Sequence, residues 1–317
     1  MRSKRWLLLV LMAAAGSAAA QSYPSKPVRF LVPYPAGGPT DAVARLIAPH
    51  LGLGQNVIVE NRSGAGGSVG ADVVAKAAPD GYMMLLGNSG PITINPVLRK
   101  DLPYHPKRDL SPVAYLTAGQ MVLVAHPSLP VRSVKQLVAL ARTHPGSLNY
   151  GSAGIGNTTH LGMELFQTMA GVKLHHVPYK GVAPAYIDLI AGQLSVMFGN
   201  ITGPLAHIQA GRLRAIAVTG PAPAAVLPGV PRVGDDYPGF ELVTWMGIFL
   251  PAATPEPIRA RLQNEFIRVL QMKDVRERLI GLGNDIVAGD GDRLSKHVDG
   301  ELALYARIIK TAGIKAE

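Results

Sequence analysis

The 317-residue sequence contains no cysteine, and this absence removes several kinds of chemistry at once. Without a thiol the chain has no disulfide, no cysteine nucleophile and no thiolate ligand for a metal. The absence says little about the compartment, because many exported proteins also lack cysteine. Charged residues are sparse as well, at 16% against 48% hydrophobic residues, which predicts a folded globular chain.

Long runs of lysine or arginine are also absent, although Lys and Arg outnumber Asp and Glu by 31 to 21. The basic residues are scattered along the chain, and aromatic residues do not alternate with them. We therefore predict a solvated basic surface and no nucleic-acid partner.

The apolar segment near the N-terminus is too short to span a bilayer. Arg2, Lys4 and Arg5 precede it, and small residues ending at Ala20 follow it. This order predicts a secretory signal peptide that is cleaved after Ala20. The mature chain then begins at Gln21 and keeps 297 of the 317 residues, and the loss of three basic residues lowers its net charge from +10 to +7. We expect a soluble, monomeric protein in the periplasm.

A chain of this length exceeds one typical core and fits two α/β lobes. Strands, glycine turns and helices alternate along it. The stretch 112–126 predicts two extended runs around Gly119 that lead into a second lobe, and Phe240–Leu250 predicts the return. We place the signal peptide at 1–20, the first lobe at 21–120 and 246–317, and the second lobe at 121–245. The C-terminal helices are expected to pack on the first lobe. Two lobes joined by two crossing segments are typical of a hinged, clam-like receptor.

The stretch Val28–Ala48 combines a strand, a glycine loop and the start of a helix, which we expect at Thr40 or Asp41. The first N–H groups of a helix lack partners within the helix, and the helix dipole places partial positive charge there. Gly37 and Gly38 let backbone approach a ligand closely, because no Cβ intervenes. This stretch predicts an anion site, unless Thr40 or Asp41 merely caps the helix and the glycines merely turn the chain.

Two other segments are expected to line the same cleft. Asn88 and Ser89 follow the strand 82–87, at the carboxyl edge of the sheet where α/β proteins bind ligands. In the second lobe, the stretch Tyr150–Phe166 repeats the strand, glycine loop and helix. The expected caps of its helix are Asn157, Thr158 or Thr159. Two helix N-termini that face each other could then hold a small anion with two polar ends without any arginine.

Several motifs suggest other functions but lack supporting residues. Gly64–Gly70 has a dinucleotide-like glycine spacing, yet the following strand ends without an acidic residue for a ribose. His160 and Glu164 lie one helical turn apart, but a metal needs a third and fourth ligand. Asp290 and Asp292 lack the rest of a calcium loop. We find no nucleophile with its base, so we predict no catalytic residue, no metal and no cofactor.

The chain contains, in this order, the runs VPYPAGGPTDAVAR, VENRSGAGGSVGADVVAKAAPDGY, GSAGIGNTTHLGMELF, HVPYKGVAPAYIDLIAGQ and IQAGRLRAIAVT, and it ends in KTAGIKAE. In these runs it closely resembles the Bug-type extracytoplasmic solute receptors of tripartite tricarboxylate transporters. The resemblance implies an α/β, two-lobe periplasmic binding protein (type II, Venus-flytrap) fold with two crossover strands, and no catalysis. It also implies a small carboxylate held largely by backbone groups and waters, and integral membrane transporter subunits as partners.

The resemblance also implies which residues contact the ligand. In the first lobe they are Tyr34, Gly37, Gly38, Thr40, Asp41, Asn88 and Ser89. In the second lobe they are Ala153, Gly156, Asn157, Thr158 and Tyr179, to which we add Asn200.

One departure from the family pattern bears on the ligand. Where relatives commonly read VDVMFDN, this chain reads LSVMFGN, so Ser195 and Gly199 replace two acidic residues. We therefore expect no preference for a ligand with a positive amine. Two alternatives remain at this point: a sensory receptor that serves a signalling partner, and a periplasmic hydrolase that uses the same cleft.

Overall fold

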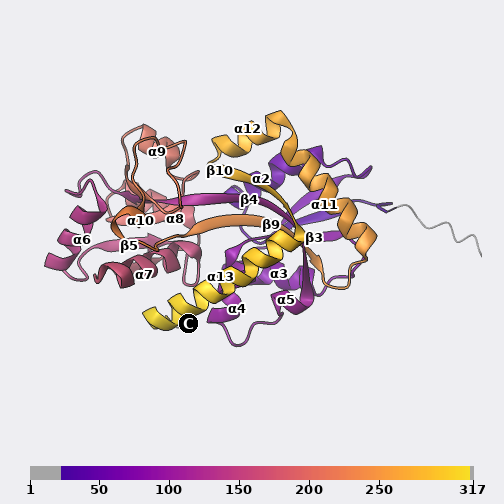
Figure 1. The fold of residues 1–317 in the computed structure, drawn as a ribbon, viewed down its shortest axis with the longest axis horizontal. Helices are drawn as coiled ribbons and strands as arrows, with labels where there is room; N and C mark the ends of the chain where they lie inside the picture. Colours follow the sequence, from indigo (N-terminus) through magenta and orange to yellow (C-terminus); the bar gives the residue numbers. More distant parts are fainter. Residues whose placement is uncertain (1–22, 315–317) are drawn as a thin grey trace, which may run out of the picture.

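The computed structural model describes residues 23–314, so the predicted signal peptide and its cleavage site lie outside the described residues. Two lobes lie side by side in Figure 1, joined by long strands that run between them. None of the helices within residues 23–314 is long and apolar enough to cross a membrane. The elements before the second lobe are β1 (Val28–Val32), α2 (Pro39–Ile47), η1 (Ala48–His50), β2 (Val57–Asn61), η2 (Ala65–Gly67), α3 (Ser68–Ala75), β3 (Met83–Gly87), η3 (Gly90–Ile94), α4 (Asn95–Leu98) and α5 (Pro106–Asp109).

The remaining elements follow the same α/β alternation. The long strand β4 (Leu110–Ala125) leads into the second lobe, and β9 (Val243–Pro251) returns from it. The second lobe contains α6 (Val134–Thr143), β5 (Asn149–Ser152), α7 (Thr158–Ala170), β6 (His175–Pro178), α8 (Val182–Ile190), β7 (Val196–Asn200), α9 (Leu205–Gln209), β8 (Arg214–Val218) and α10 (Val233–Asp236). The chain ends with α11 (Glu256–Gln271), α12 (Lys273–Gly281), β10 (Asn284–Asp290) and α13 (Gly291–Ala312).

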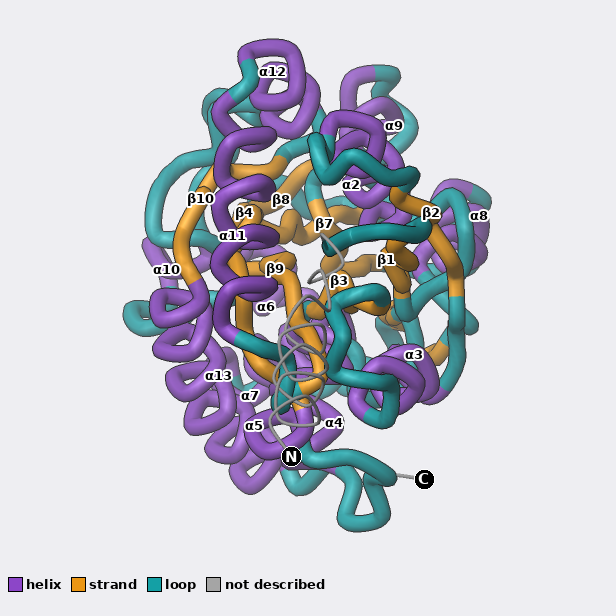
Figure 2. The backbone as a smooth tube through the Cα atoms, turned by 90° about the vertical axis from the view of Figure 1, so that its right-hand side faces the viewer, coloured by secondary structure: helices purple, strands orange, loops and turns teal. Residues whose placement is uncertain are grey.

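The first-lobe sheet is covered by helices on both faces. Strand β1 pairs in parallel with β2 and β3, and β9 runs antiparallel to β3. Because side chains alternate along a strand, Phe30 packs in one cluster with residues of α2, α11 and α12, while Leu31 packs in another with residues of α3. Figure 2 shows α11 and α3 on opposite sides of these strands. Both faces are buried, which explains the almost continuous apolar run in β1.

The second lobe is built on the far half of β4. Met121, Leu123 and Ala125 contribute to a cluster with α6 and α7, while Val122 and Val124 contribute to a cluster with α8. Strand β4 pairs antiparallel with β7, and β5 pairs in parallel with β6 and β7. The carboxyl ends of β5, β6 and β7 therefore lie at one edge of the second-lobe sheet.

Strand β4 is one continuous 16-residue strand, so the prediction of two extended runs around Gly119 is wrong. At Gly119 the strand is paired on one side with Thr244 of β9 and on the other with Asn284 of β10. A Cβ at this position would lie 3.2 Å from both the Gly283 carbonyl oxygen and Thr244 Oγ1. The glycine therefore permits a close approach of strands instead of breaking one. The predicted lobe boundaries fall inside or beside β4 and β9 and stay a prediction.

The C-terminal helices divide between the lobes. Helices α11 and α12 pack on the first lobe as expected. Helix α13 also packs on the first lobe, where it contributes Leu294 to a cluster, but it contributes Tyr305 to the second-lobe cluster as well, which the sequence did not predict. It begins at a capped N-terminus, where the Asp290 side chain accepts a bond from the Arg293 amide at 2.8 Å. This capping role explains Asp290, one of the two acidic residues that weakly suggested a calcium site.

Candidate functional site

The loop between β1 and α2 presents the start of a helix. The helix begins at Pro39, with Gly38 as its N-cap, slightly earlier than the expected start at Thr40 or Asp41. Proline has no N–H group, and the amides of Thr40 and Asp41 lie in the first turn, where the helix supplies no carbonyl partner. Gly37 has φ +81°, a conformation that favours glycine. The loop therefore has the donors and the dipole of an anion site.

The Asp41 carboxylate shapes this loop from within. It accepts bonds from the Gly37 amide, Arg45 Nε and Asn61 Nδ2, each 2.9 Å long. Burial raises the pKa of Asp41, but these bonds outweigh burial and hold the pKa below its usual value. The carboxylate is thus ionised and paired with Arg45. Its charge is balanced before any anion approaches the helix.

Two hydrogen bonds link the loop after β1 to the end of β2 and to the loop after β3. The Tyr34 hydroxyl donates to Asn88 Oδ1 at 2.8 Å, and Asn61 Nδ2 donates to the Tyr34 carbonyl oxygen at 3.0 Å. Burial raises the pKa of Tyr34, so its hydroxyl remains a neutral donor. Because β1 and β3 are parallel, both loops leave the same edge of the sheet. The structure therefore brings together the first-lobe residues that the sequence singled out.

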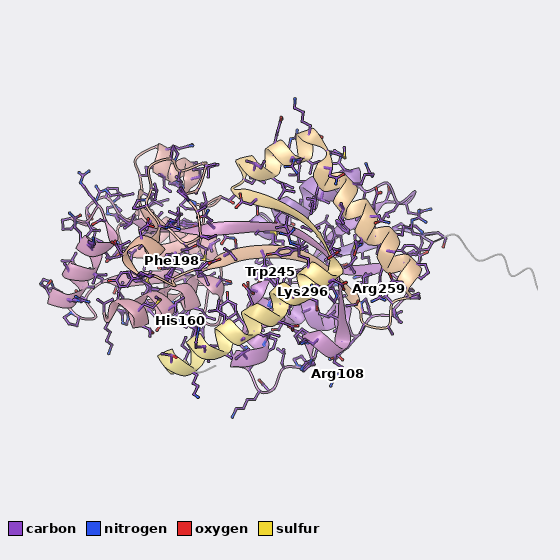
Figure 3. All side chains as sticks on the ribbon, in the orientation of Figure 1. Arg108, His160, Phe198, Trp245, Arg259 and Lys296 are labelled. Atoms are coloured by element: carbon purple, nitrogen blue, oxygen red, sulfur yellow. The ribbon has the colours of Figure 1, made fainter. Side chains whose placement is uncertain are left out.

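Ser89 is bonded to a side chain that sequence reasoning missed. Its hydroxyl donates to Glu301 Oε1 at 3.2 Å, while Thr93 Oγ1 and Trp245 Nε1 each donate to Glu301 Oε2 at 2.7 Å. Burial raises the pKa of Glu301 to about 7, although these three bonds oppose the shift. In Figure 3 Trp245 lies near the middle of the molecule, where α13 passes the crossing strands. Glu301 thus connects α13, strand β9 and the segment that follows β3.

The signal for Glu301 is present in the sequence of α13. Its buried face is formed by residues spaced four and three apart, as expected for one side of a helix. They are Leu294, Val298, Glu301, Tyr305 and Ile308. An acidic residue in an otherwise largely apolar stripe indicates a buried carboxyl group that needs donors.

The second-lobe loop between β5 and α7 repeats the arrangement of the first. Asn157 caps α7, with its Oδ1 accepting from the Thr159 amide at 3.1 Å, which confirms Asn157 among the expected caps. The Thr159 hydroxyl in turn accepts from the Ala153 amide at 2.8 Å. Gly156 has φ +72°, so the loop reaches the helix through a left-handed turn. A second helix N-terminus is therefore held in a fixed loop.

Two stacked histidines pack against this loop. The rings of His160 and His176 lie 4.2 Å apart at an angle of 17°, and Ser152 Oγ lies 2.6 Å from His176 Nε2. The Gly156 amide points toward His160 Nδ1 at 3.4 Å. Burial lowers the pKa of both histidines to about 4, so both are neutral at neutral pH. The described residues contain no group of three or more side chains suited to a metal.

Ser152 is fully buried, and the ring of its partner His176 is stacked on the rings of Tyr150 and His160. The Ser152–His176 pair resembles a nucleophile with its base, but a nucleophile must reach a substrate. This cluster therefore supports the loop between β5 and α7.

Tyr179 and Asn200 complete the second-lobe set at the same edge of the sheet. The Tyr179 amide donates to the Ser152 carbonyl oxygen at 3.1 Å, and its hydroxyl donates to Asp188 Oδ2 at 2.6 Å. Asn200 ends β7, the parallel neighbour of β5. A Cβ at Gly199 would overlap the Tyr186 hydroxyl, so this glycine makes room for Tyr186.

The first-lobe and second-lobe site residues come together near α4 and Tyr305. A Cβ at Gly156 would lie 2.5 Å from Leu98 Cδ2, so this second-lobe glycine lies against α4 of the first lobe. Ser89 and Thr158 both lie close to the hydroxyl of Tyr305. The contacts of Gly37 and Gly38 stay within the first lobe: Gly37 donates to Asp41, and a Cβ at Gly38 would meet the Pro35 carbonyl oxygen.

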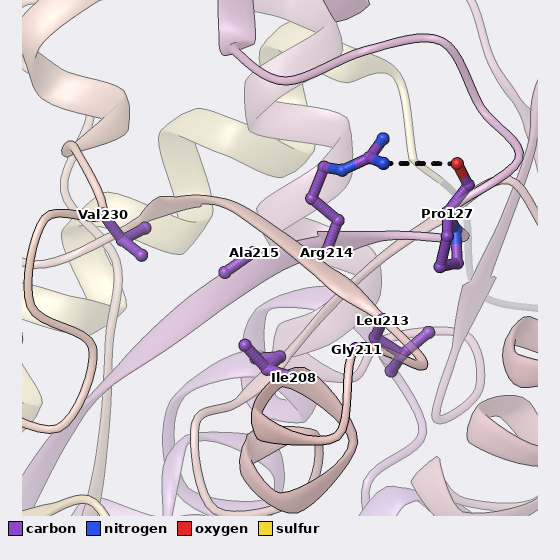
Figure 4. A pocket seen from close by; sticks show the side chains of 7 residues that line it. All are labelled: Pro127, Ile208, Gly211, Leu213, Arg214, Ala215 and Val230. Atoms are coloured by element: carbon purple, nitrogen blue, oxygen red, sulfur yellow. Dashed lines mark hydrogen bonds between the residues drawn. The ribbon is translucent and has the colours of Figure 1, made fainter.

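A hollow of about 410 Å³ lies elsewhere in the second lobe, beside β8. Figure 4 shows Arg214 at this hollow with a bond to the Pro127 carbonyl oxygen. The same guanidinium donates to the carbonyl oxygens of Leu129 and Val131, at 3.0 and 2.9 Å. Arg214 thus serves the backbone, and the remaining lining is mostly aliphatic. The hollow lies at the end of β4 farthest from the first lobe and does not overlap the predicted site.

Two α/β lobes joined by crossing strands, with glycine loops and helix N-termini at the sheet edges, define a two-lobe periplasmic binding protein. The family described as "Tripartite tricarboxylate transporter family receptor" matches residues 43–314, and the chain belongs to this family. Protein BugT of Bordetella pertussis is 35% identical over 313 residues, which cover 96% of this chain and 96% of BugT. The chain is a Bug-type receptor, and the enzymatic alternative is set aside.

Solved structures show the same fold with carboxylates bound. An R. palustris protein with adipate matches with a TM-score of 0.88 and 34% identity, over 92% of this chain and 99% of that one. MatC from Rhodopseudomonas palustris with bound malate matches with a TM-score of 0.84 and 33% identity, over 90% of this chain and 100% of that one.

Proposed function

We propose that this protein captures a small organic acid in the periplasm and delivers it to the membrane subunits of a tripartite tricarboxylate-type transporter. The observation that carries the proposal is the pair of glycine loops, each opening a helix at the edge of its own sheet. Such helix starts favour anions because their N–H groups are free and the dipole is positive there. The relatives with bound adipate and malate support a carboxylate as the ligand.

In the proposed complex the lobes close on the carboxylate, and each lobe contributes one end of the site. The donors are mainly backbone N–H groups of the two loops, together with the side chains at the ends of β3, β5 and β7. These residues are Tyr34, Gly37, Gly38, Thr40, Asn88, Ser89, Ala153, Gly156, Asn157, Thr158, Tyr179 and Asn200, with Asp41 holding the first loop. A ligand with two polar ends would satisfy both lobes.

A thermal-shift screen tests the ligand class. At a concentration a hundredfold above its Kd, a ligand adds about 2.7 kcal/mol to the free energy of unfolding, which raises Tm by roughly 5 to 10 °C for a chain of this size. We expect such shifts with mono- or dicarboxylates of two to six carbons or with aromatic acids. We expect weaker shifts with amino acids of equal length, because Ser195 and Gly199 offer no acid to a positive amine.

The matched controls are the amides of the same acids, which keep the size and lose the charge. A shift of equal size with an acid and its amide, or a strong shift with a neutral sugar, would contradict anion binding at the helix starts. Delivery is tested separately, by uptake of the bound acid in cells that lack the receptor. Uptake that does not depend on the receptor would favour the sensory alternative.

Export is part of the proposal and rests on the basic, apolar and small residues of the first 20 positions. N-terminal sequencing of the exported protein should begin at Gln21. A protein that keeps residues 1–20, or that stays in the membrane fraction, would contradict this expectation.

A further inference from the structure

The hydroxyl of Tyr305 is a buried polar group that the proposed site leaves unexplained. Tyr305 is 0% exposed, and its hydroxyl makes no hydrogen bond to any residue within the described range 23–314. Burying a hydroxyl without a partner is unfavourable, whereas phenylalanine would fill the same apolar stripe without that penalty. The position therefore points to a partner for the hydroxyl.

Helix α13 brings this hydroxyl to the boundary between the lobes. In Figure 1 the C-terminal half of α13 passes α4 and α7, and it contacts both helices. Tyr305 follows Glu301 by four residues, so both side chains lie on the same face of α13. The hydroxyls of Ser89 and Thr158 are the nearby polar groups that lower the pKa of Tyr305, against the larger effect of burial.

The hydrogen bond that Ser89 already makes to Glu301 restricts the directions of the bonds that Tyr305 can make. The only hydroxyl hydrogen of Ser89 is donated to Glu301, so Ser89 can offer Tyr305 only an acceptor. Tyr305 then donates to Ser89 and is left with lone pairs for a donor from the other side. Thr158, the first residue of α7, supplies a hydroxyl there. In this order Tyr305 and Ser89 each donate once and accept once, and Thr158 donates once.

We propose that Tyr305 is a positioning residue of the ligand site, through a relay in which Thr158 donates to Tyr305, Tyr305 to Ser89, and Ser89 to Glu301. The relay joins the start of α7 in the second lobe to the end of β3 in the first. It holds both ends of the site in register. This inference rests on the proposed function, because Ser89 and Thr158 are proposed ligand contacts.

Tyr305→Phe tests the relay by removing a single oxygen. We expect the Kd for the strongest acid in the carboxylate panel to weaken five- to tenfold, since one net hydrogen bond is worth about 1 kcal/mol. The Tm of the protein without added ligand should change by less than about 3 °C. A merely structural role would lower Tm and leave Kd unchanged, and that result would overturn the proposal.

Tyr186→Phe is the matched control. The Tyr186 hydroxyl is also buried and makes no hydrogen bond to a described residue, but it lies against Gly199 and Gly203 inside the second lobe. We expect Kd within twofold of the wild type. Equal losses of affinity in Tyr186→Phe and Tyr305→Phe would mean that the boundary position has no special role, which overturns the proposal.

A double-mutant cycle with Thr158→Val tests the order of the relay. Once Thr158 has lost its hydroxyl, the further change Tyr305→Phe should cost less than the same change in the wild type. Fully additive losses would show that the two hydroxyls act independently, and the relay would be wrong.

Hydrogen exchange separates failure of the relay from failure of the proposed function. If no carboxylate binds the wild type, the proposed function is wrong, yet the relay still predicts faster amide exchange in 86–92 and 156–161 of Tyr305→Phe without ligand. Tyr186→Phe should leave both segments unchanged. Identical exchange in Tyr305→Phe and the wild type would overturn the relay.

Discussion

Gly38→Val is expected to abolish carboxylate binding while the protein still folds. Gly38 has φ −80° and ψ 170°, which any residue can adopt, and a Cβ there would meet only the Pro35 carbonyl oxygen at an ordinary 3.5 Å. A valine side chain would, however, cover the approach to the first amides of α2. Losing two charge-assisted bonds costs roughly 3 kcal/mol, which weakens Kd about a hundredfold or more as measured by calorimetry.

The control for Gly38→Val is Gly281→Val, the same change at an exposed glycine with open space around its Cβ position. It should bind ligand as the wild type does. The sequence left open whether φ is positive at Gly38, which would have added backbone strain. The negative φ of Gly38 in the structure excludes this strain, so a loss of binding would reflect the added side chain alone. Normal binding by Gly38→Val would mean that the loop is structural.

Among the substitutions proposed for this protein, Glu301→Ala is expected to lower the free energy of unfolding most. It leaves Trp245 Nε1 and the hydroxyls of Ser89 and Thr93 without their carboxylate acceptor in a buried site. Each unsatisfied group costs about 1 to 3 kcal/mol, although hydroxyls can turn to other partners. We expect a loss of roughly 3 to 5 kcal/mol and a fall in Tm of about 5 to 15 °C by calorimetry.

Glu301→Gln is the matched control, and it adds a test of pH dependence. Native Glu301 keeps its proton up to pH about 7, whereas the unfolded chain releases it near its ordinary pKa of 4.5. The contribution of Glu301 to stability therefore declines as pH rises from 4.5 to 7, since burial of its charged form becomes costly. Glutamine does not titrate, so the Tm of Glu301→Gln should rise relative to the wild type across this window. Parallel Tm profiles would contradict a carboxyl group with a raised pKa.

Local signals in the sequence predicted most of the fold. Strands such as β1 carry a dense apolar run between turn residues, and α7 begins at an asparagine cap and ends at a glycine. Strand β10 was missed because its sequence, NDIVAGD, is largely polar and only half buried. It is a strand because the edge of β4 needs a partner, and that need is invisible in the segment itself.

The candidate site likewise contains residues that the sequence predicted and residues that it did not. The loops at Gly37 and Gly156 were found because glycines and helix caps are close together in the sequence. Glu301 and Tyr305 were missed because their roles depend on Ser89, which is 212 residues from Glu301 along the chain. Only the packing of α13 across both lobes brings these groups together, and a single sequence does not specify that packing. The acidic residue in the apolar stripe was the available signal.

The central claim is that two helix starts, one in each lobe, hold the carboxylate of the ligand. A crystal structure of the mature protein with the strongest acid from the thermal-shift panel tests it most directly. The account predicts carboxylate oxygens, or waters bonded to them, within hydrogen-bonding distance of the amides of Gly38–Asp41 in the first lobe. The other end of the ligand should lie at the amides of Ala153–Thr158 in the second lobe. A ligand found in the hollow beside Arg214, or between the lobes without contact to either loop, would contradict the account.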